Sequence, residues 1–331
     1  MILSKLKKNQ FFWNLIDKAS FLYPLFLFKK IPNEILIETT NACNLRCPVC
    51  PTHFAMKREK GFMKFELFQS IIDEFKNLEV KPRIMMIFAG EPTLNREVAK
   101  FISYASDNGH KTFISTNAVL LNKELSKNLI NAGLDSIHLC IDGANKKSHE
   151  AYRIGSNFES VKQNIEDFLS IKKELNKNNP IVAIQVLLTS YSENEVDEIT
   201  EWCRKIGADQ VNFKSLSMGS FTSEEMKEKY NYLLPTKKEY KRKQSTIYKT
   251  ICRTPNNQAV VFWNGDLGLC CIDFDSTANL PNIKENGFIK TFTSKDVRKK
   301  RKFGFQKKYG LCKKCSLGNA DFMGLNINLK K

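Results

Sequence analysis

Three cysteines stand close together after a short apolar run of this 331-residue chain. Cys43, Cys47 and Cys50 have the spacing Cys-x3-Cys-x2-Cys. Three thiolates on one loop can hold three corners of an iron–sulfur cluster, which ordinarily takes four cysteines. One iron would then keep an open position, which is what a reactive metal site requires. The alternative is a structural zinc site with His53 as the fourth ligand, although such sites usually join two paired hooks.

A second group of cysteines lies towards the C-terminus. Its members are Cys252, Cys270, Cys271, Cys312 and Cys315. Four thiolates suit either a [4Fe–4S] cluster or a zinc ribbon, because the two kinds of site share spacings. Either interpretation makes this segment dependent on metal.

Three further residues have side chains that could act as a base or a ligand. Asp273 lies just past Cys270 and Cys271 and is a candidate base or donor, although a turn carboxylate is the favoured interpretation. The catalytic base is otherwise unknown. We expect Cys140 and Cys203 to be small buried apolar residues and not ligands.

Short apolar runs alternate with amphipathic stretches between Glu34 and about Ser215. With roughly 30 residues per unit, this pattern indicates repeated βαβ elements, parallel strands and right-handed crossovers. Six units predict an α/β fold, namely a partial (β/α)6 TIM-like barrel whose chemistry gathers at the C-terminal ends of the strands. The predicted strands are Ile35–Thr40, Ile84–Phe88, Thr112–Ser115, Ser136–Ile141, Ile181–Leu188 and Gln210–Lys214.

Amphipathic spacing predicts the helices between these strands. Gly109, Gly133 and Gly207 stand where helices should end in a left-handed residue. The predicted helices lie near Phe65–Leu78, Arg96–Asn108, Lys123–Ala132, Phe158–Leu175 and Glu193–Ile206.

The first cysteine loop, residues Thr40–Cys50, resembles the signature loop of the radical S-adenosylmethionine (SAM) enzymes. Other segments follow predicted strands in the order typical of that family, so the resemblance covers about residues 35–214. Val49 departs from the aromatic residue often found there, and Ala118 replaces a usual glycine. The matching segments are Ala89-Gly90-Glu91-Pro92, Ser115-Thr116-Asn117, Leu139-Cys140-Ile141-Asp142-Gly143 and Tyr152-Arg153.

The resemblance implies that the first cysteine group binds a [4Fe–4S] cluster whose open iron chelates SAM. The implied chemistry is reductive cleavage of SAM to a 5′-deoxyadenosyl radical, which abstracts a substrate hydrogen. A one-electron donor such as flavodoxin or ferredoxin would supply the electron. For Arg153 the alternative is a solvated helix charge, because most arginines are exposed. The residues implied to bind SAM are Gly90, Glu91, Pro92, Ser115, Asn117, Asp142 and Arg153.

The second cysteine group resembles the C-terminal SPASM extension, or its shorter form Twitch, which binds auxiliary [4Fe–4S] clusters. The full SPASM pattern expects another cysteine near position 321, where this chain has Asp321. We therefore expect a small C-terminal iron–sulfur domain with one auxiliary cluster. The resemblance implies that its ligands are Cys252, Cys270, Cys312 and Cys315, with Cys271 spare or in place of Cys270.

The resemblance leaves the substrate open. Peptide-modifying relatives often carry an N-terminal precursor-binding domain, for which the segment before Glu34 is too short. We therefore expect oxidation or epimerisation of a small-molecule, sugar or cell-envelope precursor. The alternatives are a peptide- or protein-modifying enzyme resembling the sulfatase maturases and, outside the enzymes, a zinc-ribbon nucleic-acid-binding protein.

Four domains are expected: an N-terminal helical extension (1–33), the barrel (34–215), a linker with a helix (216–250) and the auxiliary-cluster domain (251–331). The net charge of +17 permits anionic partners, but no nucleic-acid module is recognisable. The sequence has neither a spanning segment nor a secretory signal, and its thiols suit a reducing compartment, so we expect a cytoplasmic protein. The basic and aromatic N-terminal extension suggests peripheral contact with the inner membrane face, or simple capping of the core.

Overall fold

A computed structural model describes residues 29–218, 222–244, 251–313, 315, 320–321 and 324–329. Most of the expected N-terminal extension, and with it the suggested membrane contact, lies outside the described residues. No helix in the described ranges is long and apolar enough to cross a membrane.

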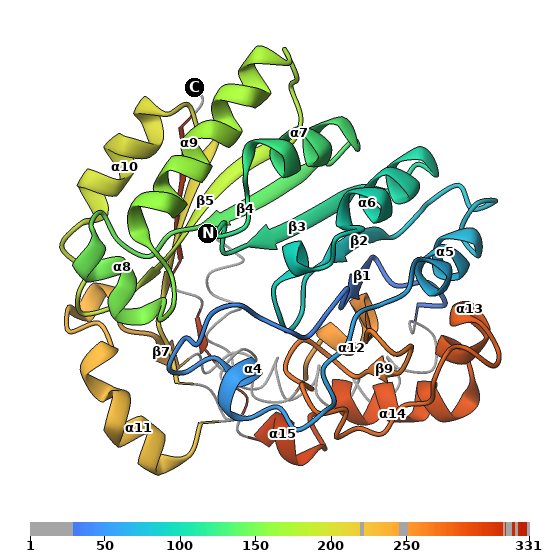
Figure 1. The fold of residues 1–331 in the computed structure, drawn as a ribbon. Helices are drawn as coiled ribbons and strands as arrows, with labels where there is room; N and C mark the ends of the chain where they lie inside the picture. Colours follow the sequence, from blue (N-terminus) through green and yellow to red (C-terminus); the bar gives the residue numbers. More distant parts are fainter. Residues whose placement is uncertain are drawn as a thin grey trace, which may run out of the picture.

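Six parallel strands form the centre of the sheet in the order of the sequence (Figure 1). The prediction of repeated βαβ units is confirmed, with strand ends shifted by a few residues. The first strand ends at Ile37, and the residues after it belong to a loop, in which Thr40 forms an isolated bridge with Phe62. The strands are β1 (Glu34–Ile37), β2 (Arg83–Met86), β3 (Thr112–Thr116), β4 (Ser136–Cys140), β5 (Ile181–Leu188) and β6 (Gln210–Ser215).

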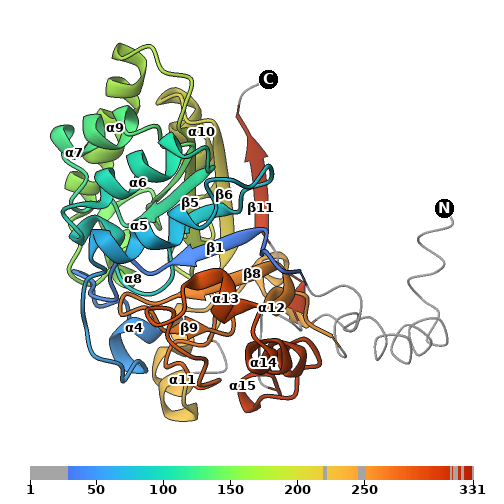
Figure 2. The same ribbon diagram turned by 90° about the vertical axis from the view of Figure 1, so that its right-hand side faces the viewer.

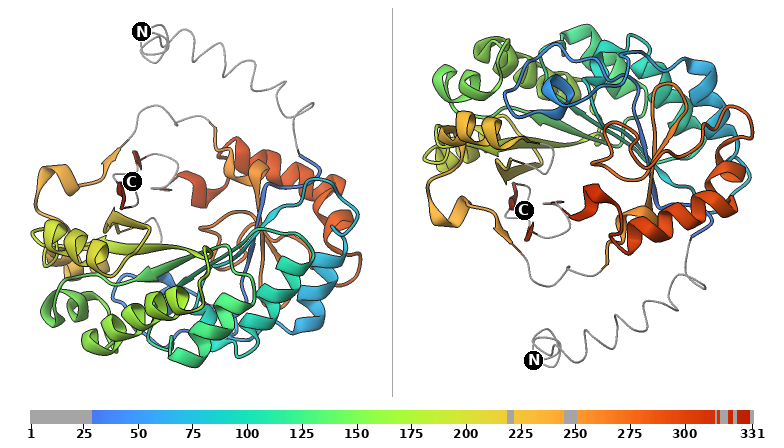
Figure 3. Two further views of the ribbon diagram at one scale, coloured as in Figure 1. Left: turned by 90° about the horizontal axis from the view of Figure 1, so that it is seen from above. Right: turned by 90° about the horizontal axis from the view of Figure 1, so that it is seen from below.

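Helices cover one face of this sheet. Figure 3 shows the sheet as an open arc with the helices on its outer side. Gly109, Gly133 and Gly207 have positive φ angles, as expected at helix ends. The long helices of this layer are α5 (Phe65–Asp73), α6 (Val98–Asp107), α7 (Lys123–Asn131), α9 (Phe158–Glu174) and α10 (Val196–Lys205).

The core lies between the sheet and this helical layer. Alternate strand residues such as Ile35, Ile114 and Ile184 are fully buried there and pack with Phe68 and Phe101. Because side chains alternate along a strand, the intervening residues point to the inner side of the arc. The inner side is therefore free to carry polar groups.

The C-terminal segment extends both edges of the sheet, which the sequence analysis did not anticipate. On one side β8 (Gln258–Val261) pairs in parallel with β1, and β9 (Leu267–Gly268) pairs antiparallel with β8. On the other side β11 (Gly324–Asn328) pairs antiparallel with β6. A turn at Trp263–Asp266 connects β8 and β9. The sheet consequently runs through nine strands of the described chain.

Short elements surround the C-terminal ends of the parallel strands. Figures 1 and 2 show α4, α11 and α15 gathered below that edge. The remaining elements are α4 (Pro51–Phe54), η1 (Pro92–Leu94), α8 (Lys146–Tyr152), α11 (Glu224–Tyr230), η2 (Asn231–Leu233), η3 (Lys238–Tyr240), β7 (Lys243–Gln244), α12 (Thr254–Asn257), α13 (Phe288–Phe292), α14 (Lys295–Phe305), α15 (Gly310–Lys313) and β10 (Ala320–Asp321).

Candidate functional site

The first cysteine loop joins β1 to α4 and is packed against the protein. Cys47 is buried, while Cys43 and Cys50 are half-buried. The amide of Leu45 donates a hydrogen bond to the Sγ of Cys43 at 3.4 Å. The amide of Arg46 donates to the carbonyl oxygen of Ile154 at 2.9 Å, which ties the loop to the end of α8. The three thiols are thus held on one ordered loop.

The pKa values of two thiols on this loop are raised, so a positively charged metal group is needed to hold them as thiolates. Burial, together with the charges of its neighbouring thiols, raises the pKa of Cys47 to about 12, against an opposing effect of Arg153. Burial likewise raises the pKa of Cys43. Without a positive partner these thiols stay protonated, and metal coordination is what deprotonates such groups.

The zinc alternative needs His53 as a fourth ligand beside the three thiols. His53 is exposed on α4. Within the described residues, no three Cys, His, Asp or Glu side chains lie close enough together to hold one metal ion. Thiolates are the usual ligands of iron–sulfur clusters, so the donor set of the loop fits such a cluster.

The loop after β2 docks directly on the cysteine loop. Gly90 has a φ of +79°, and a Cβ added there would lie 2.5 Å from the carbonyl oxygen of Thr40 and 2.6 Å from that of Ala42. The amide of Glu91 donates to the carbonyl oxygen of Ala42 at 2.8 Å. Only glycine permits this close approach. Pro92 then begins η1.

Glu91 is buried where the loops after β2 and β3 meet. Its carboxylate accepts hydrogen bonds from the hydroxyl of Thr116 at 2.7 Å and the amide of Asn117 at 2.8 Å. Thr93 donates to the same carboxylate through its amide and its hydroxyl. Burial raises the pKa of Glu91, against the effect of these hydrogen bonds. No Lys or Arg in the described ranges forms an ion pair with it.

The residues expected after β3 and β4 join the same region. The Nδ2 of Asn117 donates to the Oδ1 of Asn44, in the cysteine loop, at 2.8 Å. The hydroxyl of Ser115 lies 3.6 Å from the Sγ of Cys140. Cys140 and Cys203 are buried, as expected.

Asp142 and Arg153 form a buried ion pair beside the first cysteine loop. The Nε of Arg153 lies 2.5 Å from the Oδ2 of Asp142, and the Arg153 side chain is only 16% exposed. The amide of Leu187 donates to the other carboxylate oxygen at 2.8 Å. Burial alone would lower the pKa of Arg153. The charges of Asp142 and of nearby thiols have the larger combined effect and raise this pKa. The alternative of a solvated helix charge is wrong for Arg153.

Several polar residues on the inner face of the sheet were not predicted from the sequence. The Nζ of Lys214 donates to the Oε1 of Gln185 at 2.7 Å, and the Nδ1 of His138 lies 3.2 Å from the same oxygen. Burial, helped by the charge of Lys214, lowers the pKa of His138 to about 4, so it is neutral at physiological pH. The alternation of residues along β4, β5 and β6 was the signal that could have identified them.

The second cysteine group also comes together. Burial raises the pKa of Cys312 to about 11, and the charges of Cys252 and Cys315 add to this effect. Burial raises the pKa of Cys271 to about 12, and the charges of Cys315 and Cys252 add to this effect. Cys270 is buried and interacts first with Cys271 and then more weakly with Cys252. This donor set fits a metal cluster for the same reason as the first one.

Asp273 has the contacts of a turn carboxylate. It accepts hydrogen bonds from the amide of Leu269 at 3.1 Å and from the amide and hydroxyl of Thr277 at 2.7 Å each. Asp273 is almost completely buried. These contacts account for the residue without a catalytic role, in keeping with the favoured interpretation.

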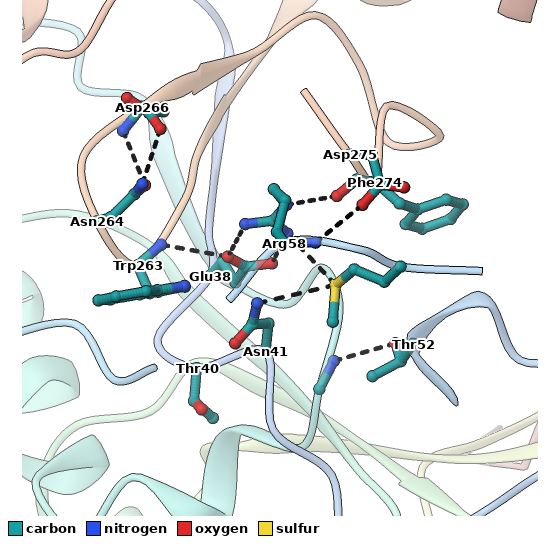
Figure 4. A network of polar contacts seen from close by, with 12 residues as sticks. Glu38, Thr40, Asn41, Thr52, Arg58, Trp263, Asn264, Asp266, Phe274 and Asp275 are labelled. Carbon is teal, nitrogen blue, oxygen red and sulfur yellow. Dashed lines mark hydrogen bonds and ion pairs between the residues drawn. The ribbon is translucent and has the colours of Figure 1, made fainter. Parts of the chain in front are cut away.

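A buried ion pair connects the two cysteine-bearing parts of the chain (Figure 4). Arg58, beyond the first cysteine loop, lies 2.6 Å from the Oε1 of Glu38 and 3.0 Å from its Oε2. The Nε of Arg58 donates to the carbonyl oxygen of Phe274, and the amide of Trp263 donates to Glu38 at 3.2 Å. The carboxylate of Asp275 accepts from the amide of Arg58 at 3.2 Å. The segment that carries Cys270 and Cys271 is thereby fastened to the loop after β1.

Two sets of thiols beside the open edge of an α/β barrel suit a protein that binds iron–sulfur clusters. The family model "Radical SAM superfamily" matches residues 37–203, half of the chain. The model "Iron-sulfur cluster-binding domain", called SPASM, matches residues 252–316. The chain belongs to the radical SAM superfamily. Its cofactors are a [4Fe–4S] cluster with SAM and an auxiliary cluster, so the zinc-ribbon alternative is not supported.

Two curated relatives match about half of this chain. The tungsten-containing aldehyde ferredoxin oxidoreductase cofactor-modifying protein of Pyrococcus furiosus is 25% identical over 187 residues, covering 55% of this chain and 51% of the relative. A probable GTP 3′,8-cyclase of Methanococcus maripaludis is 29% identical over 173 residues, covering 52% of this chain and 55% of the relative. The chain thus spans about half the length of these relatives.

Solved structures confirm the fold class. BtrN in complex with AdoMet and 2-DOIA is 18% identical with a TM-score of 0.56, covering 86% of this chain and 93% of BtrN. Streptococcus suis SuiB bound to S-adenosylmethionine is 17% identical with a TM-score of 0.61, covering 86% of this chain and 72% of SuiB. At this identity the likeness establishes the fold alone.

Proposed function

We propose that this chain reductively cleaves SAM and abstracts a hydrogen from a small-molecule, sugar or cell-envelope precursor, with oxidation or epimerisation as the outcome. One observation carries the proposal. The thiols of the first cysteine loop, the glycine turn at Gly90, the buried Glu91 and the Asp142–Arg153 pair all meet at one edge of the sheet.

Each of these residues has a proposed task. Cys43, Cys47 and Cys50 would hold the cluster, which together with SAM supplies one-electron cleavage of the sulfonium. The buried carboxylate of Glu91 offers negative charge for an ammonium group, and Gly90 lets the backbone approach it closely.

The residues at or after the ends of β3 and β4 are proposed to orient SAM and the loops around it. Arg153 offers a cation for a carboxylate, and Asp142 holds its guanidinium in place. Asn117 links the loop after β3 to Asn44, and Ser115 stands on the inner face of β3. In the second group, Cys252, Cys312 and Cys315 with either Cys270 or Cys271 would hold the auxiliary cluster. A one-electron donor such as flavodoxin or ferredoxin would serve as the partner.

Substitution of a cysteine in the first loop tests this function. We expect Cys43→Ala to abolish the formation of 5′-deoxyadenosine from SAM under anaerobic reduction with dithionite. The product is measured by liquid chromatography and mass spectrometry. The matched control is Cys203→Ala, because Cys203 is buried on α10 in the main core and not in the cluster that contains Cys47. If Cys43→Ala forms 5′-deoxyadenosine at the wild-type rate, the assignment of the loop is wrong.

A further inference from the structure

A cavity of about 560 Å³ opens beyond the C-terminal end of β6. Its volume is within the range of small-molecule sites, about 300–1,000 Å³. The lining residues come from the segment after β6 and from the region of α11, η2 and η3. They are Leu216, Ser217, Met218, Lys227, Asn231, Leu234, Pro235, Thr236, Lys241 and Arg242.

The walls of this cavity are fixed to the barrel. The amide of Leu216 donates to the carbonyl oxygen of Leu188 at 3.0 Å. The buried carboxylate of Glu193 accepts a hydrogen bond from the amide of Thr236 at 2.8 Å and another from its hydroxyl. The amide of Ser190 donates to the carbonyl oxygen of Leu233 at 3.0 Å. These contacts make the cavity a built part of the fold.

The apolar side of the cavity borders the first cysteine loop. Leu216 belongs to the buried cluster that contains Cys47 and Val49, and Met218 and Leu234 pack against that cluster. A ligand in the cavity would therefore have its apolar part next to the proposed site of SAM.

The other side of the cavity is cationic. Lys227, Lys241 and Arg242 line it, and none of the described lining residues is acidic. Lys227 is paired with Glu224 at 2.6 Å, whereas Lys241 is exposed. Arg242 is half-buried and interacts electrostatically with Cys315 and with Lys214 on the inner face of the sheet. The cationic side thus lies towards the second cysteine group.

We infer that this cavity binds a small molecule that carries a phosphate or carboxylate group, with the anion at Lys241 and Arg242 and the apolar part against Leu216 and Met218. The inference rests on the proposed function, because it names the class of its substrate. Guanidinium and ammonium groups in a partly desolvated wall recognise such anions through charge-assisted hydrogen bonds. Ser217, Asn231 and Thr236 supply neutral polar contacts between the two sides.

Calorimetric titration of the anaerobically reconstituted full chain tests the inference. Inorganic pyrophosphate and citrate are titrated separately, because pyrophosphate represents a phosphate group and citrate represents a carboxylate group. We expect at least one of them to bind with 1:1 stoichiometry and to bind at least tenfold more weakly to Lys241→Gln and Arg242→Gln. Arg242→Lys keeps the charge and should recover part of the affinity. Binding of only one probe identifies its anion as the one preferred.

The control is Lys127→Gln, which removes an exposed lysine from α7 and should bind the probe like the wild type. If neither probe binds, or if all variants bind equally, the inference is overturned. Because Lys241 is exposed, Lys241→Gln tests the inference even if Arg242→Gln does not fold. The proposed function fails separately, through absence of 5′-deoxyadenosine formation by the wild type, so the two failures are distinguishable.

Discussion

Cys270 and Cys271 are neighbours in the chain, but their thiols interact electrostatically with different side chains. Cys271 interacts with both Cys315 and Cys252, whereas no interaction with Cys315 is found for Cys270 among the leading influences on its thiol. The resemblance to the SPASM and Twitch extensions made Cys270 the expected ligand and left Cys271 spare or in place of Cys270. Because Cys271 is influenced by both Cys252 and Cys315, we propose Cys271 in place of Cys270 as the fourth ligand.

We therefore expect Cys271→Ser to lose the auxiliary cluster and Cys270→Ser to keep it. The iron content per chain should fall by about four atoms in Cys271→Ser, because one cubane cluster holds four irons. Iron analysis and electron paramagnetic resonance of the reduced protein measure this. Cys270→Ser is the matched control, and the opposite pattern would restore the original assignment.

Single residues show where sequence reasoning succeeded and where it stopped. The spacing of Cys43, Cys47 and Cys50 was informative because all three ligands lie within one loop. The partner of Arg153 was not predictable from local pattern, because the pairing depends on where α8 places the guanidinium relative to Asp142. The same limit applies to Lys214 and Gln185, which contact each other only across paired strands.

At the level of elements, periodicity located the strands and helices of the barrel because each one repeats a local pattern. The pairing of β8 with β1 was missed, since the partners are separated by more than two hundred residues. A run of four residues such as Gln258–Val261 carries too weak a pattern to specify its partner. Pairings of distant segments depend on the packed structure and not on local sequence.

The Glu38–Arg58 pair fastens two distant elements together, and its removal should weaken the fold. Glu38 is completely buried and Arg58 nearly so. Breaking a buried pair from one side typically costs about 3–5 kcal/mol, because a buried charge is left without its partner. We expect Arg58→Met to lower the melting temperature clearly. The control Arg204→Met, which breaks an exposed pair with Glu201, should change stability by less than about 1 kcal/mol.

The loss in Arg58→Met should depend on pH in a defined direction. Burial already raises the pKa of Glu38 in the folded protein, and Arg58 opposes this effect. Without Arg58 the folded state binds a proton more tightly than the unfolded state does. The melting temperature of the variant should therefore approach that of the wild type as pH falls from 8 towards 5. A loss that stays constant over this range would show that Arg58 acts through packing on Phe262 instead.

At the level of the whole molecule, the two cysteine groups lie on the same side of the sheet, around the C-terminal ends of the strands. The shared sheet and the Glu38–Arg58 pair keep the two cluster-binding regions in a fixed relation. The cavity after β6 borders one group through Leu216 and reaches the other through Arg242.

We expect the reconstituted protein to contain about eight iron and eight sulfide per chain, corresponding to two cubane clusters. Cys43→Ala should retain about four of each. Metal analysis by mass spectrometry checks both values. About four iron together with one zinc in the wild type would instead mean that the second cysteine group holds zinc.

The parallel pairing of β8 with β1 has a consequence for the order of synthesis. β1 is among the first strands of the barrel to leave the ribosome, yet its neighbour at Gln258–Val261 is made much later. Until then one side of β1 is an unpaired edge, which is prone to pairing with other chains. A nascent chain of this protein would remain vulnerable to aggregation until the segment bearing the second cysteine group had emerged, and a chaperone would matter most during that interval.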